Sequence, residues 1–236
     1  MAIPRYLAMT AAEIQQASPL PHRVCWMSCL FSPYTTALSN LPKQLPPQSL
    51  VMVTDLTPIN GHDPDACAAQ LIQLVKQFHI QGIVFDFQRP EQPDAASFLK
   101  AITAVLPCPC AISEPYAADA SCPVFVSPPP LHASLEDHLK RWQEREIWLE
   151  LAAYETKIIL TEAGSEVLTL PSGVHEGTCH EDRELHCHYS ITLSDKDAHF
   201  QLWRTATDLD LLLEEAEQYH VTNAIGLYQE FESNYG

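Results

Sequence analysis

Hydrophobic positions fall into short runs that are spaced along the whole chain. Several runs are apolar on both faces, which is typical of strands in a parallel sheet covered by helices. Eight such runs in 236 residues favour a closed (β/α)8 TIM barrel, with an open doubly wound sheet as the alternative. The runs are RYLAM near Tyr6, VCWMSCLF from Val24, SLVMVTD from Ser49, GIVFDF from Gly82, CAIS from Cys110, CPVFVS from Cys122, EIWLELAAY from Glu146 and NAIGLYQEF from Asn223.

Helical patterns separate several of these runs. Asp63 can cap a helix that has Pro64 at its first position, and Asp94 can cap another. Residues 134–145 and 208–219 have the same apolar spacing. The link 114–124 is too short and too rich in proline for a full helix, so we expect a lean barrel with some helices reduced. In TAAE, Thr10 to Glu13, the pattern is that of a capping box, which gives Glu13 a structural role.

The alternation breaks between residues 156 and 207. KIILTEAGSEVLTL and HYSITLSDKDAHFQLWRT each resemble two strands joined by a turn. We interpret 156–207 as a β-rich hairpin insertion between strands 7 and 8 of a single domain that covers residues 1–236.

Polar residues at the strand ends are the candidate functional residues. Side chains alternate along a strand, so Asp86 and Gln88 share a face with Val84, while Ile83 and Phe85 should face the helices. This alternation places Asp86 and Gln88 inside the barrel near the carboxyl end of the strand, where barrel enzymes hold their reacting groups. The further candidates are Asp55, Glu114, Glu150, Tyr154, Tyr228 and Glu230.

Several acids gathered in one mouth would raise some of their pKa values by repulsion and burial. A protonated acid would then lie beside an ionised one, which glycosidic bond cleavage requires. Trp26 is expected to offer a flat apolar face to a sugar ring. The structural alternative for each residue is that any strand end meets water and tolerates a carboxylate.

The run QGIVFDFQ, Gln81 to Gln88, resembles the fourth strand of chitinase-type barrels, glycoside hydrolase family 18, where the motif is DxxDxDxE. By this resemblance Asp86 matches the last aspartate, which helps to orient the N-acetyl group of the substrate. Gln88 stands where the family has its acid, and an amide cannot deliver a proton. The last strand lacks the tryptophan usual there, and FVSPPP departs from the MxYD pattern of the sixth strand.

The resemblance implies a barrel that binds a carbohydrate in an acidic mouth and that hydrolyses it with displaced carboxylates. Asp86, Glu230 and Glu114 are the candidate catalytic residues, with Glu230 or Glu114 as the acid. The candidate substrate-binding residues are Gln88, Tyr228, Tyr154, Glu150, Asp55 and Trp26. The alternative is a catalytically inactive barrel that serves as a carbohydrate-binding or protein-interaction module, so whether the protein is an enzyme stays open.

Charge and composition narrow the range of partners and cofactors that we expect. With 30 acidic and 13 basic side chains the formal charge is −17, which excludes nucleic acid as a partner. Glycine-rich phosphate loops are absent, so we expect no cofactor. The eight cysteines lie mostly in apolar runs, so we expect no structural disulfide, and without a signal or membrane segment we expect a cytoplasmic protein with no membrane partner.

The segment from His175 to Tyr189 concentrates four histidines and two cysteines. Such ligands can bind zinc, but their spacing matches no established pattern. A solvated loop is the favoured interpretation, and we assign no metal site.

Overall fold

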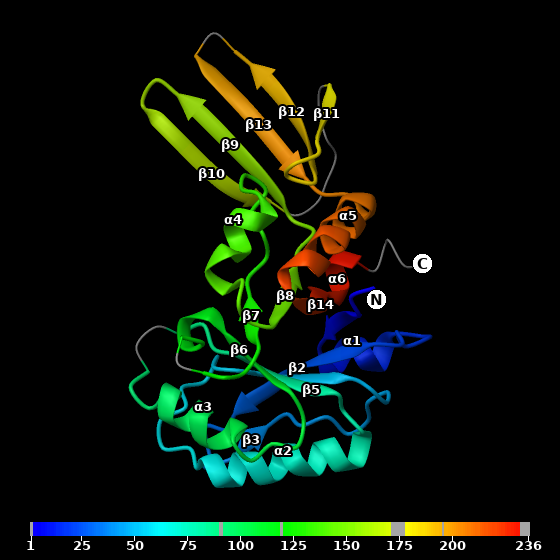
Figure 1. Ribbon diagram of the computed structural model, residues 1–236, viewed down its shortest axis with the longest axis vertical. Helices are drawn as coiled ribbons and strands as arrows, with labels where there is room; N and C mark the ends of the chain where they lie inside the picture. The colour runs from blue at the N-terminus through cyan, green and yellow to red at the C-terminus, as the bar shows by residue number, and fades with distance from the viewer. Residues whose placement is uncertain (1, 90–91, 119, 171–177, 195, 232–236) are drawn as a thin grey trace.

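The computed structural model describes residues 2–89, 92–118, 120–170, 178–194 and 196–231. Eight parallel strands form a closed ring in the order β1, β14, β8, β7, β6, β5, β4, β2, and β1 pairs with β2 to complete it (Figure 1). All eight predicted runs are strands of this ring, which confirms the predicted barrel. The strands are β1 (Arg5–Met9), β2 (Val24–Phe31), β4 (Leu50–Thr54), β5 (Gly82–Asp86), β6 (Cys110–Ser113), β7 (Val124–Val126), β8 (Ile147–Leu151) and β14 (Val221–Leu227). A short strand, β3 (Leu38–Ser39), pairs antiparallel with β2 outside the ring.

The helices that cover the ring are few and mostly short. Asp63 caps the longest described helix, α2 (Pro64–Phe78), by accepting a hydrogen bond from the Asp65 backbone N–H. Thr10 and Glu13 form the predicted capping box of α1 (Ala11–Gln16), so the Glu13 side chain serves to cap this helix. The other helices are α3 (Ala95–Thr103), α4 (Leu135–Leu139), α5 (Ala206–Ala216) and α6 (Tyr228–Phe231), with 3₁₀ turns at Glu114–Tyr116, Lys140–Trp142 and Glu217–Tyr219.

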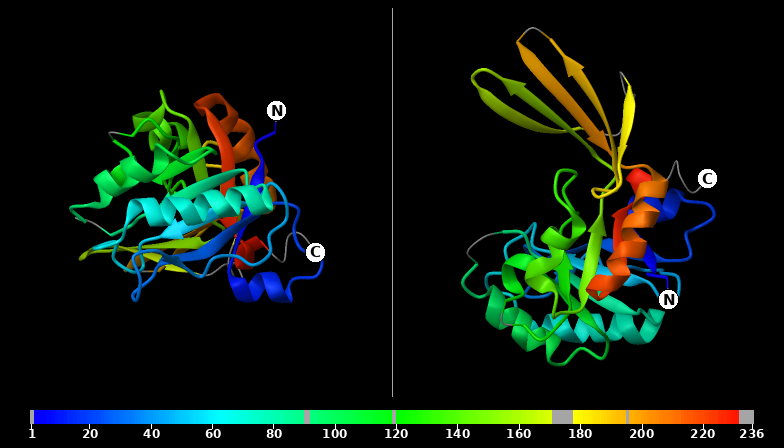
Figure 2. Two further views of the ribbon diagram at one scale, coloured as in Figure 1. Left: turned by 90° about the horizontal axis from the view of Figure 1, so that it is seen from below. Right: turned by 45° about the horizontal axis from the view of Figure 1, so that its top comes forward.

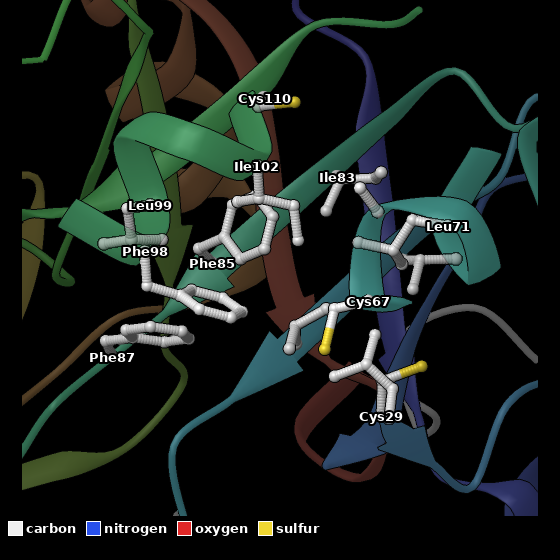
Figure 3. Close-up of a cluster of buried hydrophobic side chains, with 14 of the residues drawn as sticks. Cys29, Cys67, Leu71, Ile83, Phe85, Phe87, Phe98, Leu99, Ile102 and Cys110 are labelled. Atoms are coloured by element: carbon white, nitrogen blue, oxygen red, sulfur yellow. The ribbon is translucent and has the colours of Figure 1, made fainter. Parts of the chain in front are cut away.

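The two faces of β5 are buried in different cores, as the alternation predicts. Ile83, Phe85 and Phe87 pack outward against the helices, where Phe98 of α3 and Leu71 of α2 meet them (Figure 3). Val84 instead faces the barrel interior. The interior side chains are Tyr6, Ala8, Cys25, Leu50, Met52, Val84, Ala111, Phe125, Trp148 and Ile225. Since Asp86 and Glu150 follow Val84 and Trp148 by two residues on their strands, both point into the barrel at its carboxyl end.

Gly82 makes room for the floor of the barrel. A Cβ atom at this position would lie 2.5 Å from Cη2 of Trp148 and 3.1 Å from the Pro109 carbonyl oxygen. No side chain fits so close a contact without a shift of its neighbours. The glycine therefore lets the fully buried indole of Trp148 fill the barrel beneath the mouth.

The insertion is an antiparallel sheet that follows the carboxyl end of β8 and extends away from the barrel (Figures 1 and 2). Its strand order is β10, β9, β13, β12, β11. The predicted hairpins are present, and the structure adds β11, a strand that the sequence suggested was loop. The bounds are β9 (Glu155–Thr161), β10 (Gly164–Leu170), β11 (Cys179–Asp182), β12 (Cys187–Leu193) and β13 (Asp197–Trp203).

Buried polar contacts attach the insertion to the barrel. The Arg204 guanidinium, only 8% exposed as a residue, donates to the carbonyl oxygens of Pro129, Leu185 and His186 at 2.6 to 3.1 Å. The ring of His188 hydrogen-bonds to Asp208 at 2.8 Å. Asp208 also accepts from the backbone N–H and hydroxyl of Thr205 and thereby caps α5. These contacts fix the insertion beside the carboxyl ends of the strands.

Candidate functional site

Asp86 and Gln88 meet at the end of β5. The Gln88 amide donates a hydrogen bond of 2.5 Å to Oδ1 of Asp86. Burial raises the pKa of the Asp86 carboxyl, the hydrogen bond from Gln88 opposes that rise, and the nearby Asp55 carboxylate adds to it. The structure therefore brings the first two candidates together, with Gln88 as a donor to the aspartate.

Glu150 of β8 is the most perturbed carboxyl group of the mouth. Burial, followed by the negative charges of Asp86 and Glu230, raises its pKa from 4.5 to about 7. Unlike Asp86, it has no hydrogen-bond or ion-pair partner within the described part of the chain. Glu150 thus keeps its proton close to neutral pH, which the sequence alone could not assign to one acid among several.

Glu114, just after β6, is held as an anion. It accepts hydrogen bonds from Nε1 of Trp142 at 3.0 Å and from the backbone N–H and hydroxyl of Ser127 at 3.2 and 2.8 Å. Arg141 lies 3.8 Å away. Burial raises the pKa of Glu114, but these hydrogen bonds and the arginine together hold it below its ordinary value. These partners therefore favour the anionic form of Glu114.

A pocket of about 250 Å³ lies at the carboxyl end of the barrel and is lined by several of the candidate residues. Glu150 and Glu114 both line it, together with Gln88. It thus combines a carboxyl group of raised pKa and a carboxylate of lowered pKa, a combination that identifies acid and base roles in hydrolytic sites. The full lining is Gln88, Glu114, Pro115, Phe125, Ser127, Arg141 and Glu150.

Three candidates lie beyond the strand ends. Tyr154 follows β8, and burial raises the pKa of its phenol, with Arg204 opposing that rise and Glu150 and Glu230 adding to it. The strand β14 ends at Leu227, and Tyr228 and Glu230 lie on the short helix α6, so the expectation that the run NAIGLYQEF is a strand was wrong for its last four residues. Glu230 accepts a hydrogen bond of 2.7 Å from the Ala153 backbone N–H, which ties α6 to the end of β8.

Asp55 has a structural role at the rim. It is buried, and its two oxygens accept hydrogen bonds from the backbone N–H groups of Gln88 and Arg89 at 3.0 and 2.9 Å. The Gln92 amide donates a third bond of 2.6 Å. Asp55 therefore positions the loop that carries Gln88.

Trp26 lies on the outer face of β2, away from the barrel interior. Its neighbour Cys25 faces the barrel interior, whereas Trp26 packs in the outer core with Val51 and donates Nε1–H to the Asn40 carbonyl oxygen at 3.0 Å. The expectation that Trp26 offers a face to a sugar was wrong, because strand alternation turns it toward the helices.

Sequence reasoning missed four residues that shape the pocket. Ser127 follows a strand and could have been found by the same criterion as Glu114. Phe125 looked like an ordinary core residue of its strand. Arg141 and Trp142 carry no local signal, because the turn after α4 brings them to Glu114 from a distant part of the chain, 28 residues away for Trp142.

The histidine-rich segment divides between separate partners. His186 hydrogen-bonds to Glu215 at 2.6 Å, and His188 to Asp208. Among the described residues no three histidine, cysteine or acidic side chains converge as metal ligands, and His175 lies outside them. In the same residues every helix is too short or too polar to cross a bilayer.

No protein-family model matches the sequence, and no curated protein sequence matches it significantly. Solved structures do match. A chitinase from Chromobacterium violaceum aligns over 95% of this chain and 93% of its own, with a TM-score of 0.59 at 15% identity. The chain has the chitinase-type barrel fold.

Two further structures show the same fold at low identity. The spore cortex-lytic enzyme SleL of Bacillus cereus is 10% identical over 98% of this chain and 73% of its own, with a TM-score of 0.60. A variant of a glycoside hydrolase family 18 chitinase from Cycas revoluta, solved in complex with (GlcNAc)4, is 10% identical over 94% of both chains, also with a TM-score of 0.60. The resemblance stated for QGIVFDFQ is thus matched by the fold of the whole chain.

Proposed function

We propose that the protein is a glycoside hydrolase whose proton donor is Glu150. The observation that carries this proposal is the raised pKa of Glu150, about 7, in a pocket that it shares with the ionised Glu114. A general acid works best when its pKa lies near the working pH. The matching fold of chitinases supports a glycan as the ligand.

In the proposed reaction Glu150 delivers its proton to the oxygen that links two sugar units, so the bond from that oxygen to the anomeric carbon breaks. Asp86 and Glu114 remain negative and stabilise the positive charge that develops on the sugar ring. Water then adds to the anomeric carbon and returns a proton to Glu150. Gln88 takes no proton and serves as a hydrogen-bond donor to Asp86.

A catalytically inactive glycan-binding barrel is the second candidate function. It is favoured by Gln88, an amide at the position where the resemblance places the family's acid. The two candidates differ in turnover, since a binding barrel retains affinity for glycans without cleaving them.

Hydrolysis of (GlcNAc)4 and of chromogenic N-acetylglucosaminides tests the proposal. Glu150→Gln should reduce turnover about 100-fold or more, the usual contribution of general acid catalysis. Glu144→Gln, an equivalent change at an exposed residue just before β8, at the other end of the barrel, should leave turnover unchanged.

Two outcomes would contradict hydrolysis by Glu150. Glycan binding without turnover, with cleavage appearing only in Gln88→Glu, would favour the inactive barrel. Turnover that survives Glu150→Gln would assign the acid to another residue.

A further inference from the structure

Asp86 and Glu150 have no cationic partner among the described residues of the mouth. The charges of Asp86 and Glu230 raise the pKa of Glu150, and the charge of Asp55 raises the pKa of Asp86. All of these neighbouring charges are negative. A ligand that approaches these two acids therefore meets negative charge, whereas the charge of Glu114 in the same pocket is offset by Arg141.

The arginines around this site bind other groups, and the Arg89 guanidinium donates to the Leu56 carbonyl oxygen. Arg141 pairs with Glu114, and its guanidinium lies 4.5 Å from the centre of the Trp142 ring. Arg204 is bound to the backbone carbonyl oxygens at the base of the insertion. Arg204 is therefore committed to the structure around the pocket, whereas Arg141 lines the pocket and its charge is paired with Glu114.

An unused hydroxyl group lies beside Asp86. Thr54 pairs with Asp86 across β4 and β5, and it faces the barrel interior because it follows Leu50 and Met52 in the strand alternation. Thr54 is 8% exposed. Within the described residues its Oγ1 is the one fully buried side-chain polar atom without a hydrogen-bond partner. Buried polar groups are rarely left unpaired, so this hydroxyl indicates a place for a further hydrogen-bonding group.

We propose that the mouth recognises a free ammonium group on its glycan, so that the ligand is an oligosaccharide containing glucosamine. An ammonium group brings a positive charge for the Asp86 carboxylate and three N–H donors, which the carbonyl oxygen of the protonated Glu150 and the Thr54 hydroxyl can also accept. An N-acetyl group is neutral and offers one N–H, so it leaves the charge of Asp86 uncompensated. The formal charge of −17 also attracts a cationic glycan from a distance.

This inference names the substrate class of the proposed hydrolase and therefore rests on the proposed function. It differs from a general attraction between opposite charges, because it assigns the preference to the mouth. A matched pair of variants separates the two explanations. Asp86→Asn removes one charge in the mouth, and Glu144→Gln removes one charge at the other end of the barrel.

Calorimetric titration with the tetramer of glucosamine and with (GlcNAc)4 tests the inference, at about pH 6 and about 0.15 M salt, where exposed charges are largely screened. The glucosamine tetramer should bind at least about tenfold more tightly, the scale of one charge-assisted hydrogen bond in a half-buried site. Asp86→Asn should remove most of this preference, and Glu144→Gln should retain it. Circular dichroism melting curves establish that each variant is folded.

The outcomes are distinct. Tighter binding of (GlcNAc)4 would overturn the ammonium inference and leave the proposed hydrolase standing. An equal loss of preference in Asp86→Asn and Glu144→Gln would also overturn it, because the attraction would then be spread over the whole surface. Failure of both tetramers to bind would contradict the inference and the proposed function together.

Discussion

Replacing Glu150 by glutamine should stabilise the protein, and by an amount that depends on pH. The folded structure raises the pKa of Glu150 from 4.5 to about 7. One pKa unit corresponds to about 1.4 kcal/mol, so burial of the ionised form costs roughly 3 kcal/mol of the free energy of unfolding. Glutamine has the same shape and carries no charge, so the variant avoids this cost.

The sign of this effect on stability follows from the pH at which the folded and the unfolded chain each lose the Glu150 proton. Below pH 4.5 Glu150 is protonated in both the folded and the unfolded chain, so its ionisation has no effect on stability. Between pH 4.5 and about 7 the unfolded chain releases the proton first, which favours unfolding increasingly. Above about pH 7 both states are ionised and the full cost is present.

Urea unfolding followed by circular dichroism at about pH 4, 6 and 8 measures this effect. The difference in free energy of unfolding between Glu150→Gln and the natural protein should grow by roughly 3 kcal/mol over that range. The exposed Glu144→Gln variant is the control for the loss of one carboxyl group outside the mouth. A difference for Glu150→Gln that stays constant from acid to alkaline pH would refute the proposed electrostatics of the mouth.

Three further substitutions test the structure around the site. Gly82→Ala should lower the free energy of unfolding by about 1–3 kcal/mol, because the added methyl group would overlap Trp148, and an unchanged urea midpoint would contradict the described floor of the barrel. Asp55→Ala should increase the amide hydrogen exchange of residues 88 and 89, whose N–H groups it binds, and exchange as slow as in the natural protein would argue against its structural role. Asp208→Ala should cost about 1–2 kcal/mol in a urea titration through loss of the helix cap and of the His188 contact, whereas a neutral effect would mean that neither contact contributes.

The sequence by itself determined the elements of the barrel. Its eight apolar runs are the eight strands of the ring, because continuous apolar stretches must be buried on both faces and a closed parallel sheet does this. The alternation in GIVFDF also placed Asp86 inside and Phe85 outside, since the side-chain period of a strand is fixed by covalent geometry. Local signals were equally reliable for the capping box at Thr10 and Glu13, whose partners are three residues apart.

Only the tertiary structure distinguishes the surroundings of the acidic residues in the mouth. Glu150, Asp86 and Glu114 are all carboxyl groups at strand ends, and their pKa values diverge because burial, neighbouring charges and hydrogen-bond donors differ at each one. The donors that hold Glu114 as an anion come from Ser127 and Trp142, which no local pattern connects to it. The outward position of Trp26 likewise depends on the register of β2 within the closed ring. Such long-range contacts are fixed by packing, so local sequence patterns could list the acidic residues of the mouth but not assign their roles.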